Sequence, residues 1–269
     1  MSALLSVDNL DIRTVGRTLV SGVSFSIAAG ERVGLIGESG SGKSLTALAV
    51  LGLLPETMRA GGSIRLDGRQ VIGAHDRDLV PLRGVSIAAV FQEPMTALDP
   101  LMRIGDQVGE VVRRRTLRDG EKPGNTEVQA RVLALLERVA LPEPERIARA
   151  YPHEISGGQR QRAAIAMAIA CRPKLLIADE PTTALDVTTQ AEILKLLETL
   201  VRDEAMGLLF ISHDLPVVAT IAERALVMRH GNLIEEGRVA TLFDRPTHPY
   251  TEGLVAAARA FDAALEMTP

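Results

Sequence analysis

The stretch Gly37-Glu-Ser-Gly-Ser-Gly-Lys-Ser44 decides the fold of this chain. Four residues separate its first glycine from Gly42-Lys43-Ser44, which is the spacing of a phosphate-binding loop. Glycines let backbone N–H groups approach phosphate oxygens without side chains in the way, and a helix after the loop turns its positive end towards the same anion. We therefore predict a nucleotide site, with the Lys43 ammonium at the β and γ phosphates and the Ser44 hydroxyl on Mg²⁺.

The segments on both sides of the loop agree with this prediction. Residues 31–37 have the pattern of a buried strand that runs into a glycine-rich turn, and residues 43–54 have the pattern of a helix that stops before Pro55. A strand, a phosphate-type loop and a helix in this order indicate a parallel α/β sheet. An idle glycine turn would match the loop pattern by chance in about one chain of this length in a hundred, and the flanking strand and helix lower those odds further.

The rest of the chain alternates between strand-like and helix-like patterns. Further strands are expected at residues 63–68, 85–91, 174–178 and 207–211, and a hairpin at residues 225–235. Helices are expected at residues 104–115, 126–140, 157–171, 189–202 and 250–265. The helices between residues 95 and 171 follow one another without a strand pattern, which indicates a helical insertion in the α/β core.

Composition excludes several classes of protein. The 269 residues are 46% hydrophobic and 24% charged with a net charge of −4, which argues against disorder. Nucleic-acid-binding proteins usually carry a basic excess, so we expect no nucleic-acid partner. Cys171 is the single cysteine, which excludes a disulfide framework and a thiolate metal site, and its apolar neighbours indicate a buried, inert thiol. The longest apolar runs reach about half a membrane span, so we expect any role at a membrane to go through a partner.

Two carboxylates end the predicted strand in Leu175-Leu-Ile-Ala-Asp179-Glu180. Asp179 is of the type that holds Mg²⁺, directly or through water, and Glu180 could polarise an attacking water as a general base. Apolar strands also often end in acidic residues that only face solvent. Without the loop at residues 37–44, the two interpretations carry about equal weight.

The segment Ile155-Ser-Gly-Gly-Gln159 predicts a second anion-binding helix terminus. Ser156 is a typical N-cap, and the two glycines after it leave the backbone of the first turn exposed. The positive end of a helix favours an anion there. Two such termini far apart in sequence raise the question of what the second one holds.

With these motifs the chain resembles the ABC ATPase family over nearly its whole length. The family signature is usually Leu-Ser-Gly-Gly-Gln, and Ile155 replaces the leucine here. Gln92 resembles the family's Q-loop glutamine, Ala184-Leu-Asp186 its D-loop, and His213 its switch histidine. Taken singly, a glutamine or histidine after a strand is usually an ordinary loop residue, but here all the motifs occur in the family's order and spacing.

The resemblance implies an α/β fold with a P-loop NTPase (RecA-like) core, an inserted α-helical subdomain and an N-terminal antiparallel β region. The core is expected over residues 1–94 and 172–240, the helical signature subdomain over residues 95–171, and a C-terminal extension over residues 241–269.

It also implies a head-to-tail dimer in which two cassettes grip ATP from both sides. The start of the helix at Ser156 of one cassette would touch the γ-phosphate held by the loop of the other. Nucleotide contacts are expected at Gly37, Glu38, Ser39, Gly40, Ser41, Gly42, Lys43, Ser44, Leu45, Ser156, Gly157, Gly158, Gln159 and Asp186. Catalysis is expected to depend on Glu180, His213, Gln92 and Lys43, and Mg²⁺ binding on Ser44, Gln92 and Asp179.

Residues 91–100 and 246–254 resemble the peptide and nickel importer branch of the family. This branch implies an ATP-hydrolysing subunit, peripheral at the cytoplasmic face of the cell membrane, that energises import of peptides, nickel or related small solutes. Expected partners are transmembrane permease subunits, a second and non-identical ABC ATPase subunit, and a periplasmic or lipoprotein solute-binding protein. The cargo itself is not readable from the ATPase.

One family feature is missing. The family normally stacks adenine on an aromatic residue near the position of Thr14, but the first aromatic here is Phe25. Base stacking contributes about 1–3 kcal/mol, so we predict weaker or less base-selective ATP binding. Two alternatives remain: a catalytically weak or regulatory cassette paired with an active partner, and a soluble ABC ATPase outside transport. The second usually carries tandem cassettes or a long coiled coil, and neither pattern occurs here.

Overall fold

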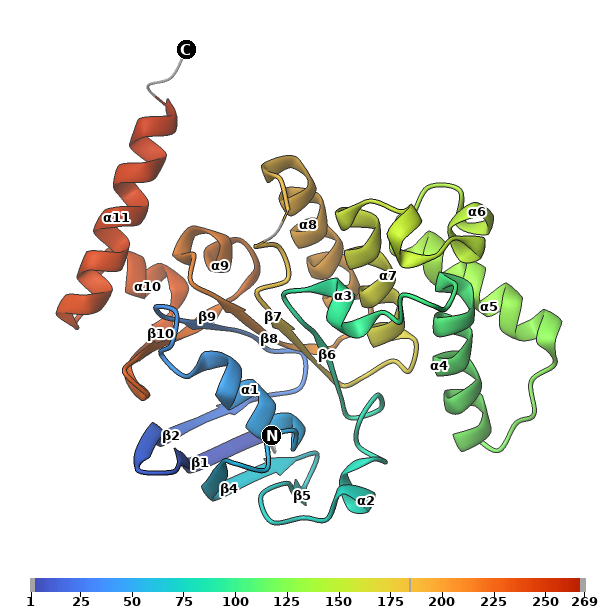
Figure 1. The fold of residues 1–269 in the computed structure, drawn as a ribbon. Coiled ribbons are helices and arrows are strands. Elements are labelled where there is room, and N and C mark those ends of the chain that lie inside the picture. Colours follow the sequence, from blue (N-terminus) through green and yellow to red (C-terminus); the bar gives the residue numbers. More distant parts are fainter. Residues whose placement is uncertain (1–2, 184, 267–269) are drawn as a thin grey trace. The chain divides into compact units, whose positions relative to one another are not determined.

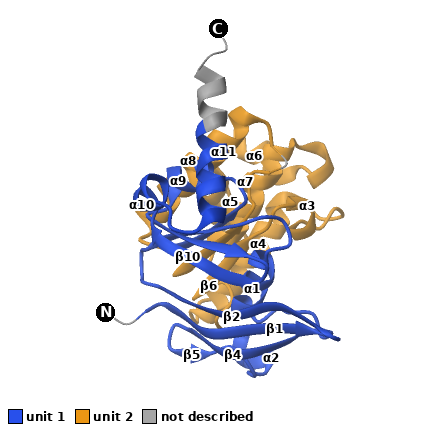
Figure 2. Ribbon diagram, turned by 90° about the vertical axis from the view of Figure 1, so that its left-hand side faces the viewer, with its two compact units in different colours: residues 1–80, 207–269 blue, residues 81–206 orange. Residues whose placement is uncertain are grey.

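The computed structural model describes residues 3–183 and 185–266 (Figure 1). The chain divides into two compact units (Figure 2), one made of residues 1–80 and 207–269 and the other of residues 81–206. We call them the first and the second unit and describe each by itself. The helical segment expected over residues 95–171 lies within the second unit, and the extension expected over residues 241–269 belongs to the first.

The first unit begins with an antiparallel sheet in the strand order β2-β1-β4-β5. Its strands are β1 (Leu5–Thr14), β2 (Arg17–Ile27), β4 (Arg59–Leu66) and β5 (Arg69–Gln70). On β1, alternation and bulges bring Leu5, Val7, Leu10 and Ile12 into the core. The sheet confirms the expected N-terminal antiparallel region.

A second set of strands in this unit is mostly parallel. Strand β3 (Arg32–Ile36) lies between β8 (Gly207–Ser212) and β9 (Arg224–Arg229), parallel to both, and β10 (Asn232–Arg238) returns antiparallel to β9. Strand β8 is buried along its whole length, as expected for a strand covered on both faces. The remaining elements of the unit are α1 (Lys43–Leu51), α2 (Asp76–Leu79), α9 (Leu215–Ile221), α10 (Val239–Asp244) and α11 (Pro249–Glu266).

Helix α1 ends three residues earlier than predicted. Gly52 adopts a left-handed conformation (φ 65°) and its N–H caps the helix on the carbonyls of Leu48 and Ala49. Because glycine takes this conformation without a steric cost, it ends the helix before Pro55 can act.

The second unit combines two parallel strands, β6 (Ile87–Val90) and β7 (Leu175–Asp179), with helices. The helices are α3 (Pro94–Ala97), α4 (Ile104–Arg118), α5 (Asn125–Arg138), α6 (Pro144–Arg149), the short 3₁₀ helix η1 (Pro152–Glu154), α7 (Gly157–Ile169) and α8 (Val187–Asp203). Helix α4 packs against α5, α6 and α7, and α7 packs on β6. The helices from α3 to α7 confirm the predicted helical insertion.

Across residues 3–183 and 185–266, no helix is both long and apolar enough to cross a bilayer. Cys171 is a free, buried thiol, and burial raises its pKa above the ordinary value. The expectation of an inert cysteine therefore agrees with its surroundings.

Candidate functional site

The glycine-rich loop lies in the first unit, between the end of β3 and the start of α1. Lys43 is 5% exposed, and its ammonium donates hydrogen bonds to the carbonyl oxygens of Gly37 (2.7 Å) and Glu38 (2.9 Å). A β-carbon at Gly37 would fall 2.2 Å from the carbonyl oxygen of Met228. The loop therefore needs glycine there, and it holds the ammonium with its own backbone.

The start of α1 is arranged to receive an anion. Its N-cap is Gly42, in a left-handed conformation (φ 102°), with no side-chain capping bond. The first N–H groups of a helix have no partner within the helix, so here they can meet phosphate oxygens. The hairpin between β9 and β10 supports the loop, because the Gly231 N–H donates to the Ser41 carbonyl (3.1 Å).

His213 follows strand β8, the parallel neighbour of β3. Parallel neighbours place their carboxyl ends at the same edge of a sheet, so the first unit brings the loop and His213 to one edge. Asp214 caps α9 by accepting the Val217 N–H (3.4 Å), and its own N–H donates to the Ser212 hydroxyl (3.0 Å). His213 is exposed, as is Ser44, while Leu45 is half-buried.

The second unit carries Gln92, Asp179 and Glu180 in the same way. Gln92 follows β6, and Asp179 ends β7, its parallel neighbour. Asp179 is 7% exposed and Gln92 is exposed. Glu180 adopts a left-handed backbone (φ 47°), uncommon for a residue with a β-carbon, and its carboxylate accepts the Thr183 hydroxyl proton (3.1 Å). Such strain is typical of functional positions.

The predicted N-cap of α7 is confirmed. The Gln159 N–H donates to the Ser156 hydroxyl (3.2 Å), and the Ser156 N–H donates to the Gln159 side-chain oxygen (3.0 Å), which is a reciprocal capping box. Ser156 and Gly157 are exposed, so this helix terminus is open for a ligand or a partner. Ile155 is buried (5% exposed). Isoleucine and the leucine of the family signature are aliphatic side chains of similar size, so Ile155 fills this place without disturbing the helix terminus.

The turn before α8 is held by Asp186. Its carboxylate accepts the N–H (3.0 Å) and the hydroxyl (2.7 Å) of Thr189, and these hydrogen bonds lower the pKa of Asp186. Ala184, the first residue of the expected D-loop, lies outside the described residues. Sequence reasoning missed the contact with Thr189, although Asp186 just before a helical pattern is a typical N-cap residue.

One contact reaches the loop from far along the chain, and sequence reasoning missed it as well. The hydroxyl oxygen of Tyr250, in the first turn of α11, accepts the N–H of Glu38 (3.0 Å). The only signal was that Tyr250 lies in the segment 246–254, which matches the importer branch.

Comparison with known proteins decides the family. The profile of the family described as "ABC transporter" matches residues 20–183, a stretch that includes the loop, Gln92, the signature segment and both carboxylates. The chain belongs to the ABC transporter family.

Two ABC transporter relatives are similar over almost the whole chain. The oligopeptide transport ATP-binding protein OppD of Mycobacterium tuberculosis is 47% identical over 268 residues, which is 98% of this chain and 43% of that protein. OppD of Escherichia coli K12 is 46% identical over 246 residues, covering 91% of this chain and 72% of that protein. The chain thus spans less than half of the mycobacterial relative and most of the enterobacterial one.

A solved ABC cassette has the same fold. The cassette MJ0796, a dimer in a post-hydrolysis state bound to ADP and Pi, superposes with a TM-score of 0.76 at 28% identity, covering 87% of this chain and 98% of that one. The expected P-loop NTPase fold is therefore confirmed.

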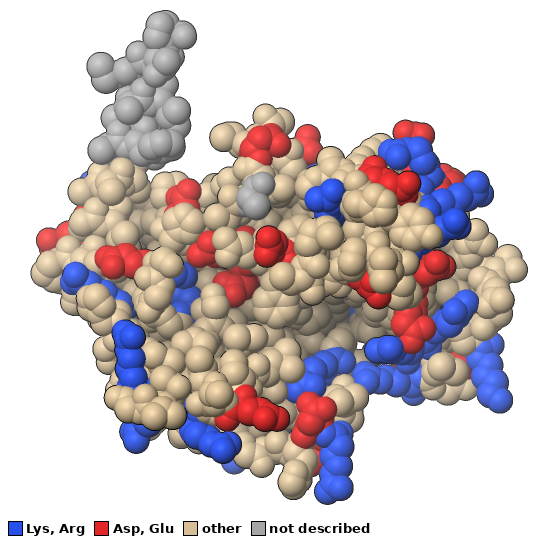
Figure 3. All heavy atoms as spheres, in the orientation of Figure 1, with Lys and Arg blue, Asp and Glu red and all other residues tan. Residues whose placement is uncertain are grey.

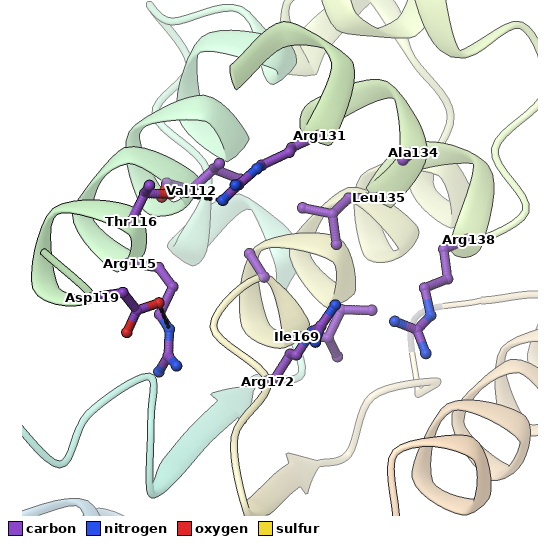
Figure 4. Close-up of a pocket in the computed structure, with 11 residues that line it drawn as sticks. Val112, Arg115, Thr116, Asp119, Arg131, Ala134, Leu135, Arg138, Ile169 and Arg172 are labelled. Carbon is purple, nitrogen blue, oxygen red and sulfur yellow. Dashed lines mark hydrogen bonds and ion pairs between the residues drawn. The ribbon is translucent and has the colours of Figure 1, made fainter. Parts of the chain in front are cut away.

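A cavity of about 500 Å³ lies in the second unit, and none of the residues that line it is an expected nucleotide contact (Figure 4). Its wall, formed by α4, α5 and the end of α7, comprises Val112, Arg115, Thr116, Asp119, Arg131, Ala134, Leu135, Arg138, Ile169, Ala170 and Arg172. Lys and Arg gather over this α4–α5 region, with Asp and Glu among them (Figure 3).

The arginines of this cavity are largely neutralised. Arg115 pairs with Asp119 (2.9 Å), Arg131 with Glu127 (2.7 Å), and Arg138 with Glu204. The remaining attraction for an anion is therefore small, and we assign no ligand to the cavity.

Proposed function

We propose that this chain binds and hydrolyses MgATP and so powers the import of peptides or related small solutes through a membrane permease. The observation that carries the proposal is the loop, in which Lys43 is fixed on the backbone beside a helix start without a side-chain cap. That arrangement suits a triphosphate. The similarity to proteins named for oligopeptide transport supports the cargo class.

ATP would be bound between two cassettes. The loop of one cassette would hold the phosphates, and Ser156, Gly157 and Gly158 of the other would meet the γ-phosphate from the opposite side. Two observations support this arrangement. The α7 terminus is exposed, and the Ser156 hydroxyl that caps it accepts the N–H of Gln159 and not that of Gly157 or Gly158. The similar cassette MJ0796 was solved as a dimer with ADP and Pi.

Hydrolysis would rest on positioning and charge. Glu180 would take a proton from the attacking water, while Lys43 and His213 would stabilise the charge that develops on the γ-phosphate. Gln92 would orient water near the phosphate. The places of three of these residues support such roles: His213 and Gln92 are exposed and follow the parallel strands β8 and β6, and Glu180 follows β7.

The donor set fits Mg²⁺. The ion prefers oxygen ligands, and the donor set is made of oxygens: the Ser44 hydroxyl in the first turn of α1, the Gln92 amide oxygen after β6 and the buried Asp179 carboxylate at the end of β7. When bound, Mg²⁺ would neutralise phosphate charge. We assign these three residues to it.

The assembly follows the importer branch. We propose a place at the cytoplasmic face of the membrane, with permease subunits, a solute-binding protein and a second ATPase subunit that is a non-identical homologue. Peptides are favoured over nickel, because both relatives described above are named for oligopeptide transport.

A regulatory cassette with weak activity is the second candidate, favoured by Thr14 in place of the adenine-stacking aromatic. Phosphate release from MgATP by the full chain, alone and with its permease, tests the main proposal. We expect the wild-type chain to hydrolyse ATP, and we expect Lys43→Ala to lose both ATP binding and hydrolysis. ATP binding without hydrolysis, in the presence of the permease and a partner ATPase, would favour the regulatory candidate instead.

A further inference from the structure

The contact between Tyr250 and the loop is not used by any of the proposed catalytic roles. Tyr250 and Glu38 are 212 positions apart in the chain, and both belong to the first unit. The tyrosine hydroxyl accepts the backbone N–H of Glu38 at 3.0 Å. The extension after β10 therefore reaches the main chain of the phosphate-binding loop.

The peptide group that Tyr250 contacts is also the one that holds Lys43. Its N–H, from Glu38, donates to Tyr250, and its C=O, from Gly37, accepts the Lys43 ammonium at 2.7 Å. One peptide plane is thus held at both edges. Hydrogen bonds in such a chain polarise and strengthen one another, so a change at Tyr250 is transmitted to Lys43.

Tyr250 is itself firmly positioned. The Arg229 guanidinium lies over its ring, 4.8 Å from the centroid, a favourable cation–π distance. The Tyr250 N–H donates to His248 Nδ1 (3.0 Å), and Glu235 accepts the Thr247 N–H (2.7 Å) and the His248 N–H (3.1 Å). Segment 247–250 is therefore tied to β10 before it meets the loop.

The phenol also stays protonated under ordinary conditions, because burial raises the pKa of Tyr250 above its usual value. A neutral hydroxyl suits the observed contact, since it accepts the Glu38 N–H without placing a negative charge beside the incoming phosphates.

We propose that Tyr250 is a positioning residue for nucleotide binding, which fixes the Gly37–Glu38 peptide and through it the Lys43 ammonium. This rests on the proposed function, that the loop binds ATP. The Lys43 ammonium is held by the carbonyls of both peptide groups that flank Glu38. The Glu38 N–H, taken by Tyr250, then serves the loop's shape rather than the phosphate.

The test uses the full-length chain with Tyr250→Phe, which removes only the hydroxyl. One lost hydrogen bond corresponds to about a two- to ten-fold change. We expect ATP affinity to weaken by about that factor and KM for ATP to rise with it, while kcat stays near the wild-type value. Simple loss of folded protein would lower kcat and leave KM unchanged.

The matched control is Tyr151→Phe, which makes the same chemical change at the other tyrosine. The sequence has two tyrosines and no tryptophan. Tyr151 lies in the second unit, stacked on His153.

The control variant also supplies a second readout. In Tyr151→Phe, Tyr250 is the single tyrosine, so its emission and its ionisation report on the loop directly. We expect ATP to change that emission and the phenol to titrate above the usual range. Unchanged ATP affinity in a folded Tyr250→Phe protein overturns the inference. If that variant does not fold, an emission that ATP leaves unmoved overturns it. A wild-type chain that binds no ATP at all would instead refute the proposed function, and this inference with it.

Discussion

Thr189 lies directly behind Gly158, so closely that a β-carbon at position 158 would fall 2.6 Å from Thr189 Cγ2. The same threonine donates both its N–H and its hydroxyl to Asp186. One residue of α8 thus supports the start of α7 and the turn that carries Asp186, all within the second unit. Glycine at position 158 is required by packing behind the helix terminus as well as by access in front of it.

Gly158→Ala should therefore destabilise the protein. Overpacking costs about 1–3 kcal/mol, which exceeds the gain of up to about 1 kcal/mol from the higher helix propensity of alanine. Urea unfolding of the full chain should give a lower midpoint with an unchanged slope.

Thr189→Ser provides the matched background for this substitution. Serine keeps the hydroxyl that bonds Asp186 and removes the methyl group that clashes. In that background Gly158→Ala should be neutral or stabilising, since only the propensity gain remains. The packing explanation is wrong if alanine is equally destabilising in both backgrounds.

Glu180→Gln should separate binding from hydrolysis. The amide keeps the size of the side chain but cannot take a proton, so turnover should fall by about 10²- to 10⁴-fold while ATP affinity is retained. ATP would then hold two cassettes together, and size-exclusion chromatography with ATP should detect a dimer that wild type forms only transiently.

Glu137→Gln is the control for this prediction, because Glu137 is exposed on α5 and its substitution makes the same chemical change. It should hydrolyse ATP at the wild-type rate. Wild-type turnover in Glu180→Gln would remove Glu180 from the role of general base.

The ion pair between Glu31 and Arg224 should make stability fall in acid. The Arg224 guanidinium bonds the Glu31 carboxylate at 2.7 Å, and the Ala28 N–H donates to it at 2.8 Å. Burial alone would raise the pKa of Glu31, but these partners outweigh it and the pKa lies below its ordinary value of 4.5.

A carboxyl group whose pKa is lowered by folding contributes stability above its unfolded value, and the contribution disappears as the pH falls through the folded value. The free energy of unfolding should therefore decline below about pH 4.5, and Glu31→Gln should flatten that decline while lowering stability at neutral pH. Glu56→Gln, in an exposed loop, is the control. An equal acid slope in Glu31→Gln and wild type would contradict the prediction.

Local patterns could be predicted from the sequence, and contacts between distant segments could not. The strand, loop and helix around Gly42 follow from glycine spacing and periodicity, and the cap at Ser156 follows from Gln159 three residues later. The contact of Tyr250 with Glu38 joins positions far apart in sequence, and no local pattern encodes it. The left-handed backbone of Glu180 was equally out of reach, because a carboxylate at a strand end gives no sign of strain.

Adenine recognition gives the last prediction. Thr14 ends β1, at the position where the family resemblance predicts the base-stacking residue. Its hydroxyl donates weakly to the Thr57 carbonyl (3.4 Å), and the neighbouring Val15 is 96% exposed. With no aromatic face there, wild type should bind ATP and GTP with affinities within about ten-fold of each other.

Thr14→Tyr should tighten ATP binding by about ten-fold, since base stacking contributes about 1–3 kcal/mol. Thr14→Leu, which adds apolar bulk without a π face, should give a much smaller gain in ATP affinity. Calorimetric titration of wild type, Thr14→Tyr and Thr14→Leu with ATP and with GTP measures these affinities. Tight, adenine-selective binding by wild type would mean that another part of the first unit or a partner holds the base, because neither Thr14 nor Val15 offers a surface on which a purine can stack.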